Sequence, residues 1–233
     1  MEGVRELEIK ILFILYPGMT QLDFAAPFEV FARLPEARVR LASPDGGLVA
    51  TELGLTYRGI EPLERVDGCD LLCIPGGFDQ SPLLVPAVLE RIAALAGGAR
   101  YVTSVCTGSL VLAAAGLLKG RRSACHWSCL ELLRDFGALP DRGRIVRDGK
   151  FITAAGVTAG MDFALTCAAE LAAPVTARAI QLLLEYAPEP PFDCGRPEAA
   201  PPEVVAECRR LATLFRDRLR TVPPAACPSH GEE

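Results

Sequence analysis

The feature that most constrains the fold of this chain is the almost unbroken apolar run from Ile9 to Tyr16, which ends at Pro17-Gly18. Strands that are buried on both faces have this composition, and such strands build parallel sheets whose two faces are covered by helices. A second run of the same kind, Asp70 to Ile74, ends at Pro75-Gly76-Gly77. The two runs predict an α/β fold around a buried, parallel sheet.

Helical and extended segments alternate along the chain. Apolar residues recur at helical spacing from Thr20 to Leu34, with Thr20 as the expected N-cap. Such alternation predicts an open, mostly parallel sheet with helices on both faces, and ligands are expected at the carboxyl ends of its strands. Further strands are expected at 39–43, 101–105 and 121–125, and a hairpin at 144–153. Residues 48–57 are expected to form an edge strand, or a hairpin that turns around residues 45–47. Further helices are expected at 86–95, 107–118, 129–136, 161–171, 175–186 and 203–219.

The length of 233 residues, half of them hydrophobic, predicts one large α/β domain with an ample core. We expect this domain to span residues 1–221, including a C-terminal helix, and residues 222–233 to form a frayed tail. The chain carries 24 Lys and Arg against 29 Asp and Glu, a net charge of −5. Because binding to a phosphate backbone requires a basic face, nucleic acid is not an expected partner.

Cysteine usage and hydropathy indicate the compartment. Nine cysteines, an odd number, are scattered through apolar segments, and this is not the pattern of a disulfide framework. The first ten residues lack the apolar stretch of a signal peptide, and no run approaches the roughly 18 apolar residues of a membrane span. We therefore expect a cytoplasmic protein that does not bind membranes.

The sharpest local motif is Ser104-Val105-Cys106-Thr107-Gly108, at a predicted strand-to-helix junction. It matches a nucleophile elbow, in which the central residue is strained and the residues two positions away must be small. A thiol at a helix N-terminus is expected to favour the thiolate. Cys106 is therefore the candidate nucleophile, and the alternative is that it packs the strand end as buried cysteines often do.

Backbone amides near Cys106 are candidate donors toward developing negative charge. One is the amide of Thr107, directly after the cysteine, and the others are those of Gly76 and Gly77 at the end of the neighbouring strand. Glycine lets the backbone approach a ligand closely, although Pro-Gly-Gly is equally typical of a plain turn. The Thr107 hydroxyl is a candidate for positioning water or substrate, with helix capping as the alternative.

Two further side chains are acid–base candidates. Asp23 is the one carboxylate in an apolar stretch near the start of the first helix, where a raised pKa would let it shuttle a proton, and helix capping is the alternative. His126, which follows a predicted strand, is the one histidine outside the C-terminal tail. A structural role is as compatible with its position. Cys125, His126 and Cys129 lack the second ligand pair typical of a metal site, and no metal is expected.

Several segments together resemble the ThiJ/PfpI superfamily, which has the class I glutamine amidotransferase-like fold. They include the Cys106 motif, Asp23 within Gln21-Leu22-Asp23, Pro75-Gly76-Gly77, His126-Trp127 and residues 156–162. Residues 101–112 and 184–192 are most similar to the isocyanide hydratases of that superfamily. The resemblance implies a flavodoxin-like three-layer sandwich with a nucleophile elbow, and a homodimer.

The resemblance also implies a reaction. The cysteine, Cys106 here, attacks the isocyanide carbon to form a thioimidate, Asp23 exchanges a proton with the thiol and the reacting carbon, and water releases an N-substituted formamide. No cofactor is needed for such a hydration. The substrate is then a small molecule.

Two other functions fit part of the pattern. The same motifs occur in the amidase-like sensory domains of transcription regulators, which bind a ligand without turnover, but the 31 residues after Pro202 are expected to form only one helix and a tail. Another alternative is a redox-sensing protein whose Cys106 becomes oxidised to the sulfinic acid. Glyoxalase or amidase activity of the same superfamily is a third, although glyoxalases carry glutamate where Asp23 stands.

Overall fold

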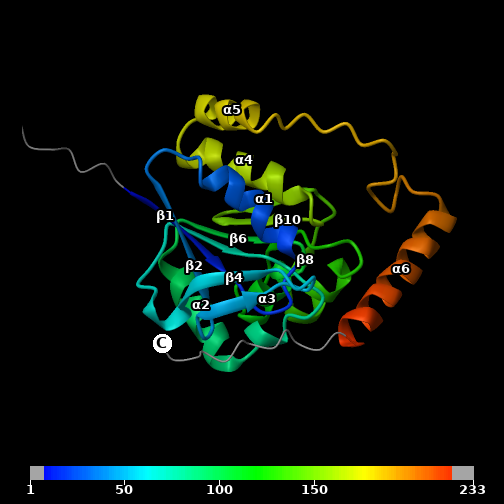
Figure 1. Ribbon diagram of the computed structural model, residues 1–233, viewed down its shortest axis with the longest axis horizontal. Helices are drawn as coiled ribbons and strands as arrows, with labels where there is room; N and C mark the ends of the chain where they lie inside the picture. The colour runs from blue at the N-terminus through cyan, green and yellow to red at the C-terminus, as the bar shows by residue number, and fades with distance from the viewer. Residues whose placement is uncertain (1–7, 222–233) are drawn as a thin grey trace, which may run out of the picture. The chain divides into compact units, whose positions relative to one another are not determined.

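The strands up to Tyr186 form one eight-stranded sheet and one two-stranded sheet (Figure 1). The computed structural model describes residues 8–221. The large sheet contains β1 (Ile9–Ile14), β2 (Ala37–Ser43), β3 (Gly47–Ala50), β4 (Thr56–Pro62), β5 (Leu71–Ile74), β6 (Tyr101–Val105), β9 (Ile145–Asp148) and β10 (Phe151–Ala154), and the small sheet contains β7 (Arg122–Ser123) and β8 (Leu139–Pro140). The order in the large sheet is β3-β4-β2-β1-β5-β6-β10-β9.

The inner strands of the large sheet are all parallel. Parallel pairs join β4 to β2, β2 to β1, β1 to β5, β5 to β6 and β6 to β10, while only the edge strands β3 and β9 pair antiparallel. Strands β1 and β5 are fully apolar where they pair, and Leu72 and Cys73 are both inaccessible to solvent. The mostly parallel sheet predicted from the apolar runs is therefore confirmed.

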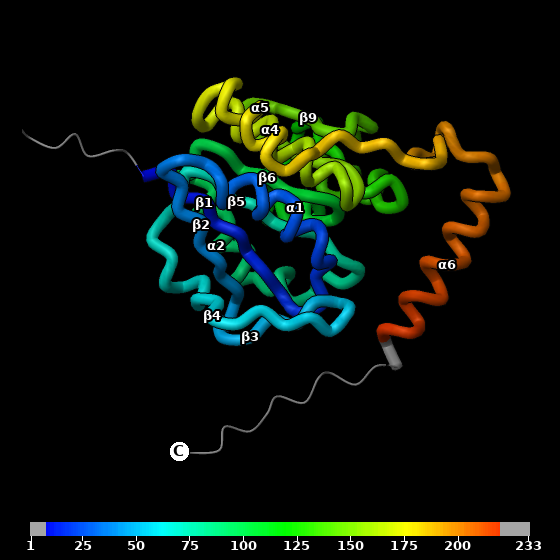
Figure 2. Tube along the Cα trace, turned by 45° about the horizontal axis from the view of Figure 1, so that its top comes forward, coloured from blue at the N-terminus to red at the C-terminus, as the bar shows by residue number. Residues whose placement is uncertain are grey.

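Helices cover both faces of the sheet, so the predicted three-layer sandwich is also confirmed (Figures 1 and 2). Helices α1 (Gln21–Phe31) and α4 (Ala159–Leu171) pack together on one face, with α5 (Pro174–Leu183) beside α4, and α2 (Pro86–Gly98) and α3 (Gly108–Ala114) cover the other. Three short 3-10 helices, η1 (Leu63–Arg65), η2 (Ser81–Leu83) and η3 (Leu130–Phe136), lie in the connections.

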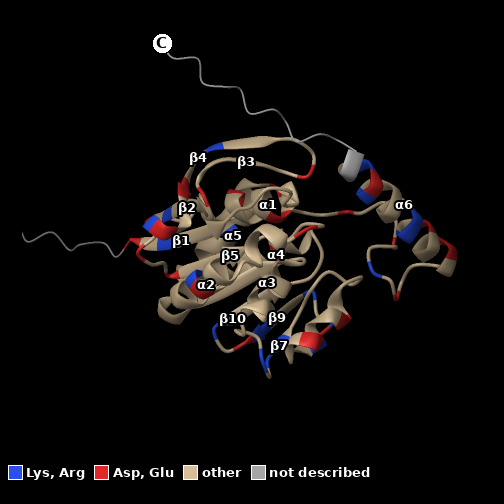
Figure 3. Cartoon of the chain, turned by 90° about the horizontal axis from the view of Figure 1, so that it is seen from below, with Lys and Arg blue, Asp and Glu red and all other residues tan. Residues whose placement is uncertain are grey.

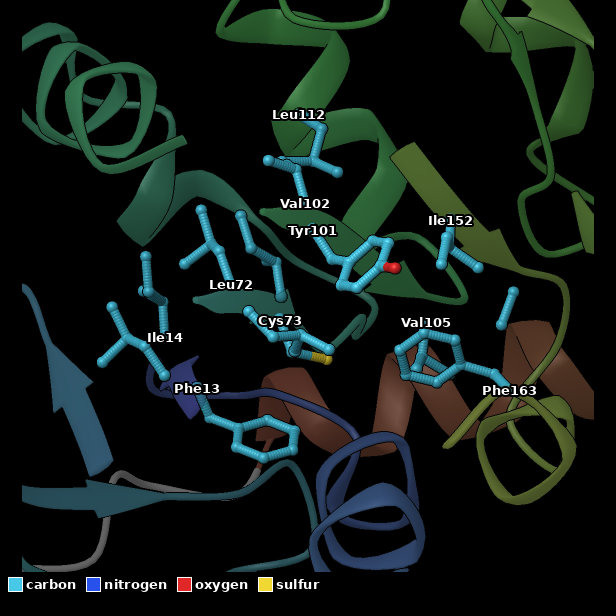
Figure 4. Close-up of a cluster of buried hydrophobic side chains, with 14 of the residues drawn as sticks. Phe13, Ile14, Leu72, Cys73, Tyr101, Val102, Val105, Leu112, Ile152 and Phe163 are labelled. Atoms are coloured by element: carbon cyan, nitrogen blue, oxygen red, sulfur yellow. The ribbon is translucent and has the colours of Figure 1, made fainter. Parts of the chain in front are cut away.

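Successive side chains along each strand point to opposite faces of the sheet, so the core has one part on each face (Figure 4). Phe13 and Cys73, which are in register, lie on the face of α1 and α4, where the Phe13 ring is 6.0 Å from that of Phe31. Leu72 and Val102, also in register, lie on the opposite face. Because both faces are buried, these strands need no polar side, which explains their nearly continuous apolar sequence.

Several sequence-based boundaries differ from the structure, and the strand expected at 121–125 is shortened to β7 in the separate two-stranded sheet. The hairpin between β3 and β4 turns at residues 51–55, where the Thr51 amide bonds the Leu55 carbonyl at 2.8 Å, and not around residues 45–47. The predicted turn fails because β4 lies between β2 and β3 in the sheet. The helix expected at 107–118 ends at Ala114, and the segment 129–136 is a 3-10 helix.

Within the described chain, the residues from Ala187 to Thr221 belong to a second compact unit. It contains a connector without regular structure and helix α6 (Pro202–Thr221), which carries both acidic and basic residues (Figure 3). Whether α6 belongs to the same domain as the sheet stays a prediction, and the tail predicted at 222–233 lies outside the described residues. Within residues 8–221, no helix has both the length and the apolar content needed to cross a membrane.

Candidate active site

The carboxyl ends of β1, β5, β6 and β10 lie side by side and carry the candidate residues. Register pairs Phe13 with Cys73, Ile74 with Ser104, and Val105 with Ala154. After β1, the chain forms β2, β3 and β4 on one side of β1 and then β5 on its other side. The sheet therefore has a topological switch point between β1 and β5. Open α/β sheets bind ligands outside the strand ends at such a point.

Cys106 has the strained backbone expected of an elbow. Its φ is +58°, in the left-handed region that costs a non-glycine residue about 1–3 kcal/mol. The surroundings hold this conformation, because the Cys106 amide donates to the carbonyls of Ala154 at 3.1 Å and Ala155 at 2.8 Å, and the Ser109 hydroxyl donates to the Cys106 carbonyl at 3.1 Å. The prediction of a strained turn at Cys106 is confirmed.

Gly108 shows why the position after Thr107 must be small. A Cβ at Gly108 would lie 2.1 Å from the Ile74 carbonyl oxygen, because the elbow presses the start of α3 against the end of β5. We expect Gly108→Ala to lower the free energy of unfolding by about 3 kcal/mol, as overpacking against backbone does. Gly97→Ala in α2 is the matched control, since nothing lies within 4 Å of its Cβ position. Denaturant unfolding of both variants tests this, and equal stabilities would contradict it.

Asp23 is fully buried in the first turn of α1 and does not cap that helix. Its Oδ2 accepts a hydrogen bond of 2.9 Å from the Gly76 amide, which ties α1 to the end of β5. Its Oδ1 is buried and has no hydrogen-bond partner among the described residues. Burial raises the pKa of Asp23 to about 7, whereas the hydrogen bonds from Gly76 and Cys106 lower it. The raised pKa expected from the apolar sequence is therefore confirmed.

The Cys106 thiol interacts with Asp23, but its acidity differs from the expectation. Burial, followed by the negative charge of Asp23, raises the pKa of Cys106 well above its ordinary value. The Thr107 amide at the start of α3 hydrogen-bonds the sulfur and lowers the pKa by less. The prediction that the helix N-terminus favours the thiolate is wrong for this resting site, because the sulfur is desolvated beside a carboxylate. The thiol can ionise by giving its proton to Asp23.

The Gly76 and Gly77 amides are not free donors, which corrects the expectation from the sequence. The Gly76 amide binds Asp23, and the Gly77 amide donates to the Thr107 hydroxyl at 2.9 Å. That hydroxyl in turn donates to the Gly77 carbonyl at 2.7 Å and makes no capping bond. Glycine is still required, because a Cβ at Gly76 would lie 2.6 Å from the Thr107 nitrogen. The corner therefore positions Asp23 and Thr107.

Three side chains near the site were not predicted. Tyr16, just after β1, is inaccessible to solvent, and its hydroxyl lies 3.3 Å from the Pro75 carbonyl. Gln80 contacts the Tyr16 hydroxyl and donates to the Thr107 hydroxyl at 2.9 Å. Glu52, in the β3–β4 turn, raises the pKa of Asp23 through its negative charge. Only Tyr16 had a signal in the sequence, as the one hydroxyl at the end of an apolar strand.

Among the described residues, no hydrogen bond joins His126 to Cys106 or Asp23; its partner is Ser128. Its Nδ1 lies 2.8 Å from the Ser128 hydroxyl, and its ring lies beside Gly156, where a Cβ would be 3.2 Å from Cδ2. Burial lowers its pKa, and His126 is not among the groups that shift the pKa of Cys106. A role for His126 in acid–base chemistry stays a prediction. Among residues 8–221, no three His, Cys, Asp or Glu side chains are grouped to hold a metal ion.

A strained cysteine beside a buried carboxyl group, at the carboxyl edge of a parallel sheet, defines a flavodoxin-like α/β protein with a cysteine elbow. Residues 9–170 match the model of the DJ-1/PfpI family. The chain belongs to this family.

Individual relatives of this chain have a known structure or function. The chain is 47% identical over 207 residues to the isonitrile hydratase of Pseudomonas putida, covering 88% of this chain and 91% of that protein. A crystal structure of a ThiJ/PfpI family protein from Pseudomonas syringae superposes with a TM-score of 0.85 at 37% identity, covering 91% and 89% of the two chains. The HTH-type transcriptional regulator CdhR of Pseudomonas aeruginosa is 31% identical, but the match covers 70% of this chain and only 50% of the regulator.

Proposed function

We propose that this protein is an isocyanide hydratase, a lyase that adds water to R–N≡C and releases the N-substituted formamide R–NH–CHO. The observation that carries the proposal is the buried pair of Cys106 and Asp23 at the elbow. The 47% identity to an isonitrile hydratase over nearly the whole of both chains supports this substrate class.

The first step uses the two groups together. Asp23, with a pKa of about 7, accepts the thiol proton of Cys106 as the sulfur attacks the terminal carbon of the isocyanide. The same proton then passes from Asp23 to that carbon, which gives the thioimidate R–N=CH–S–Cys106. A soft sulfur nucleophile suits the isocyanide carbon, and the Thr107 amide stabilises the negative charge on sulfur.

The second step consumes water. Asp23, again a carboxylate, takes a proton from water as the water oxygen bonds to the thioimidate carbon, and it passes this proton to the nitrogen. The adduct R–NH–CH(OH)–S–Cys106 then collapses: Asp23 removes the hydroxyl proton, the carbon–sulfur bond breaks, and the proton returns to the sulfur as the formamide leaves. The buried Asp23 serves both steps because its pKa, about 7, lies close to neutral pH.

The assay is direct. Purified, reduced protein is mixed with cyclohexyl isocyanide, and the formamide is quantified by mass spectrometry, with methylglyoxal and a simple amide as competing substrate classes. We expect turnover of the isocyanide alone. No formamide from several alkyl and aryl isocyanides would refute the proposal, and turnover of methylglyoxal would favour a glyoxalase instead.

We also propose that the enzyme works as a homodimer in a reducing compartment, the cytoplasm. The eight cysteines within residues 8–221 are free thiols, which suits such a compartment. Exposed leucines on the β3–β4 hairpin, Leu48, Leu53 and Leu55, offer apolar surface to a second copy. Sedimentation equilibrium should give twice the mass of the 24.9 kDa chain. A concentration-independent monomer would contradict the dimer.

A further inference from the structure

Glu52 adjoins the candidate site although no step of the proposed reaction uses it. Its backbone amide donates to the Met19 carbonyl at 3.1 Å, and the Thr20 hydroxyl bonds its carboxylate. Met19 forms a β-bridge with Gly77, and the Thr20 amide donates to the Gly76 carbonyl at 2.9 Å. These contacts join the β3–β4 turn to the corner that holds Asp23.

The Glu52 carboxylate is incompletely satisfied. Its Oε2 is buried and makes no hydrogen bond with the described residues. The charge of Glu52 raises the pKa of both Asp23 and Tyr16, so the carboxylate acts on the two side chains that flank Cys106. A partly buried charge of this kind is weakly screened, and its field acts on any group that enters the site.

The groups around the sulfur all carry charge of one sign when they ionise. Within the described chain, none of Asp23, Glu52 and Tyr16 makes a hydrogen bond or an ion pair with a Lys or Arg side chain; their partners are backbone groups, Thr20, Gln80 and the Cys106 thiol. A substrate with its own carboxylate would therefore approach Asp23 and Glu52 with no cation beside them to offset the repulsion.

We infer that Glu52 is a specificity-determining residue that makes this site select substrates without a negative charge. The inference rests on the proposed function, because it names the class of isocyanide turned over: neutral isocyanides, and not those with a carboxylate next to the isocyano group. Glu52 acts through its fixed charge and not through bond making.

Alkylation of Cys106 tests the inference without any turnover. Iodoacetamide and iodoacetate have similar size and differ in charge; in both, the sulfur–carbon bond forms as iodide leaves. Labelling at pH 8 is followed peptide by peptide, and exposed Cys194 in the same chain is the internal reference. We expect the iodoacetate-to-iodoacetamide rate ratio at Cys106 to be about tenfold lower than at Cys194, a difference of about 1.4 kcal/mol.

The variant Glu52→Gln keeps a hydrogen-bonding group for Thr20 and removes the charge. It should raise the rate ratio at Cys106 about tenfold and leave Cys194 unchanged, whereas the matched Glu90→Gln on the exposed side of α2 should change neither. Equal ratios at Cys106 and Cys194 in the wild type, or no change in Glu52→Gln, would overturn the inference. So would labelling of Cys194 without any labelling of Cys106 by the neutral reagent.

Turnover gives the second readout. Methyl isocyanoacetate and isocyanoacetate form a neutral and anionic pair, and Glu52→Gln should improve kcat/KM for the anion about tenfold relative to the ester. If both compounds are hydrated and the ratio of their kcat/KM values is the same in wild type and Glu52→Gln, the role of Glu52 is refuted and the hydratase function is not. If the labelling pattern is as expected but neither compound is hydrated, the hydratase function is refuted and the role of Glu52 is not.

Discussion

Cys106→Ala should reduce isocyanide turnover by about 10³-fold or more while the protein stays folded. The sulfur provides the bond to the isocyanide carbon, and no other group at the elbow can replace it. Alanine leaves the backbone contacts of residue 106 in place, because its amide donates to Ala154 and Ala155 and its carbonyl accepts from Ser109. The expected loss is therefore chemical and not structural.

The matched control is Cys208→Ala, which removes an exposed thiol from α6. It should retain full activity, and both variants should melt close to the wild type. Mass spectrometry of protein quenched during turnover should find the mass of one isocyanide on the peptide that contains Cys106, and none in the alanine variant. Full turnover by Cys106→Ala would show that the nucleophile assignment is wrong for any substrate.

Asp23→Asn should lower turnover by about 10²–10⁴-fold and should also stabilise the protein above neutral pH. Asparagine can accept the hydrogen bond from Gly76 but cannot take the thiol proton of Cys106, so the proton shuttle is lost. Asp67→Asn, an exposed change of the same chemistry, should leave turnover intact. Steady-state kinetics of the two variants separate these outcomes.

The stability effect follows from the pKa of Asp23. This pKa rises from 3.8 to about 7 on folding, so between these pH values the folded protein holds a proton that the unfolded chain releases. The contribution of Asp23 is complete below pH 3.8 and is lost as pH rises through about 7. At 1.36 kcal/mol per pKa unit, the loss reaches about 4 kcal/mol at pH 8, and Asn does not suffer it.

Denaturant unfolding at pH 4 and pH 8 measures this difference. Wild type and Asp23→Asn should have similar free energies of unfolding at pH 4, and the variant should be the more stable protein at pH 8. A stability gap that does not change with pH would mean that Asp23 does not titrate near 7, and the proton shuttle would then need another group.

Much of the fold could be predicted because its signals are local. Strands β1 and β5 are buried on both faces, so their sequences are nearly all apolar, and β6 was placed at Tyr101–Val105, as found. The hairpin at β9 and β10 follows from Asp148-Gly149 at its turn. The β3–β4 turn was misplaced because strand order, which puts β4 beside β2, is a property of the whole sheet and leaves no mark in residues 45–55.

The sequence by itself determined the buried strands of the sheet, the elbow, and Cys106 and Asp23 as candidate site residues, since each signal depends on residues close together in the chain. Only the tertiary structure decided their chemistry. Burial beside Asp23 raises the Cys106 pKa against the effect of the helix N-terminus, and the Gly76 and Gly77 amides are used to hold Asp23 and Thr107. Glu52 and Gln80 join the site across long stretches of chain. Desolvation and long-range contacts exist only once the strand ends meet, so no local pattern encodes them.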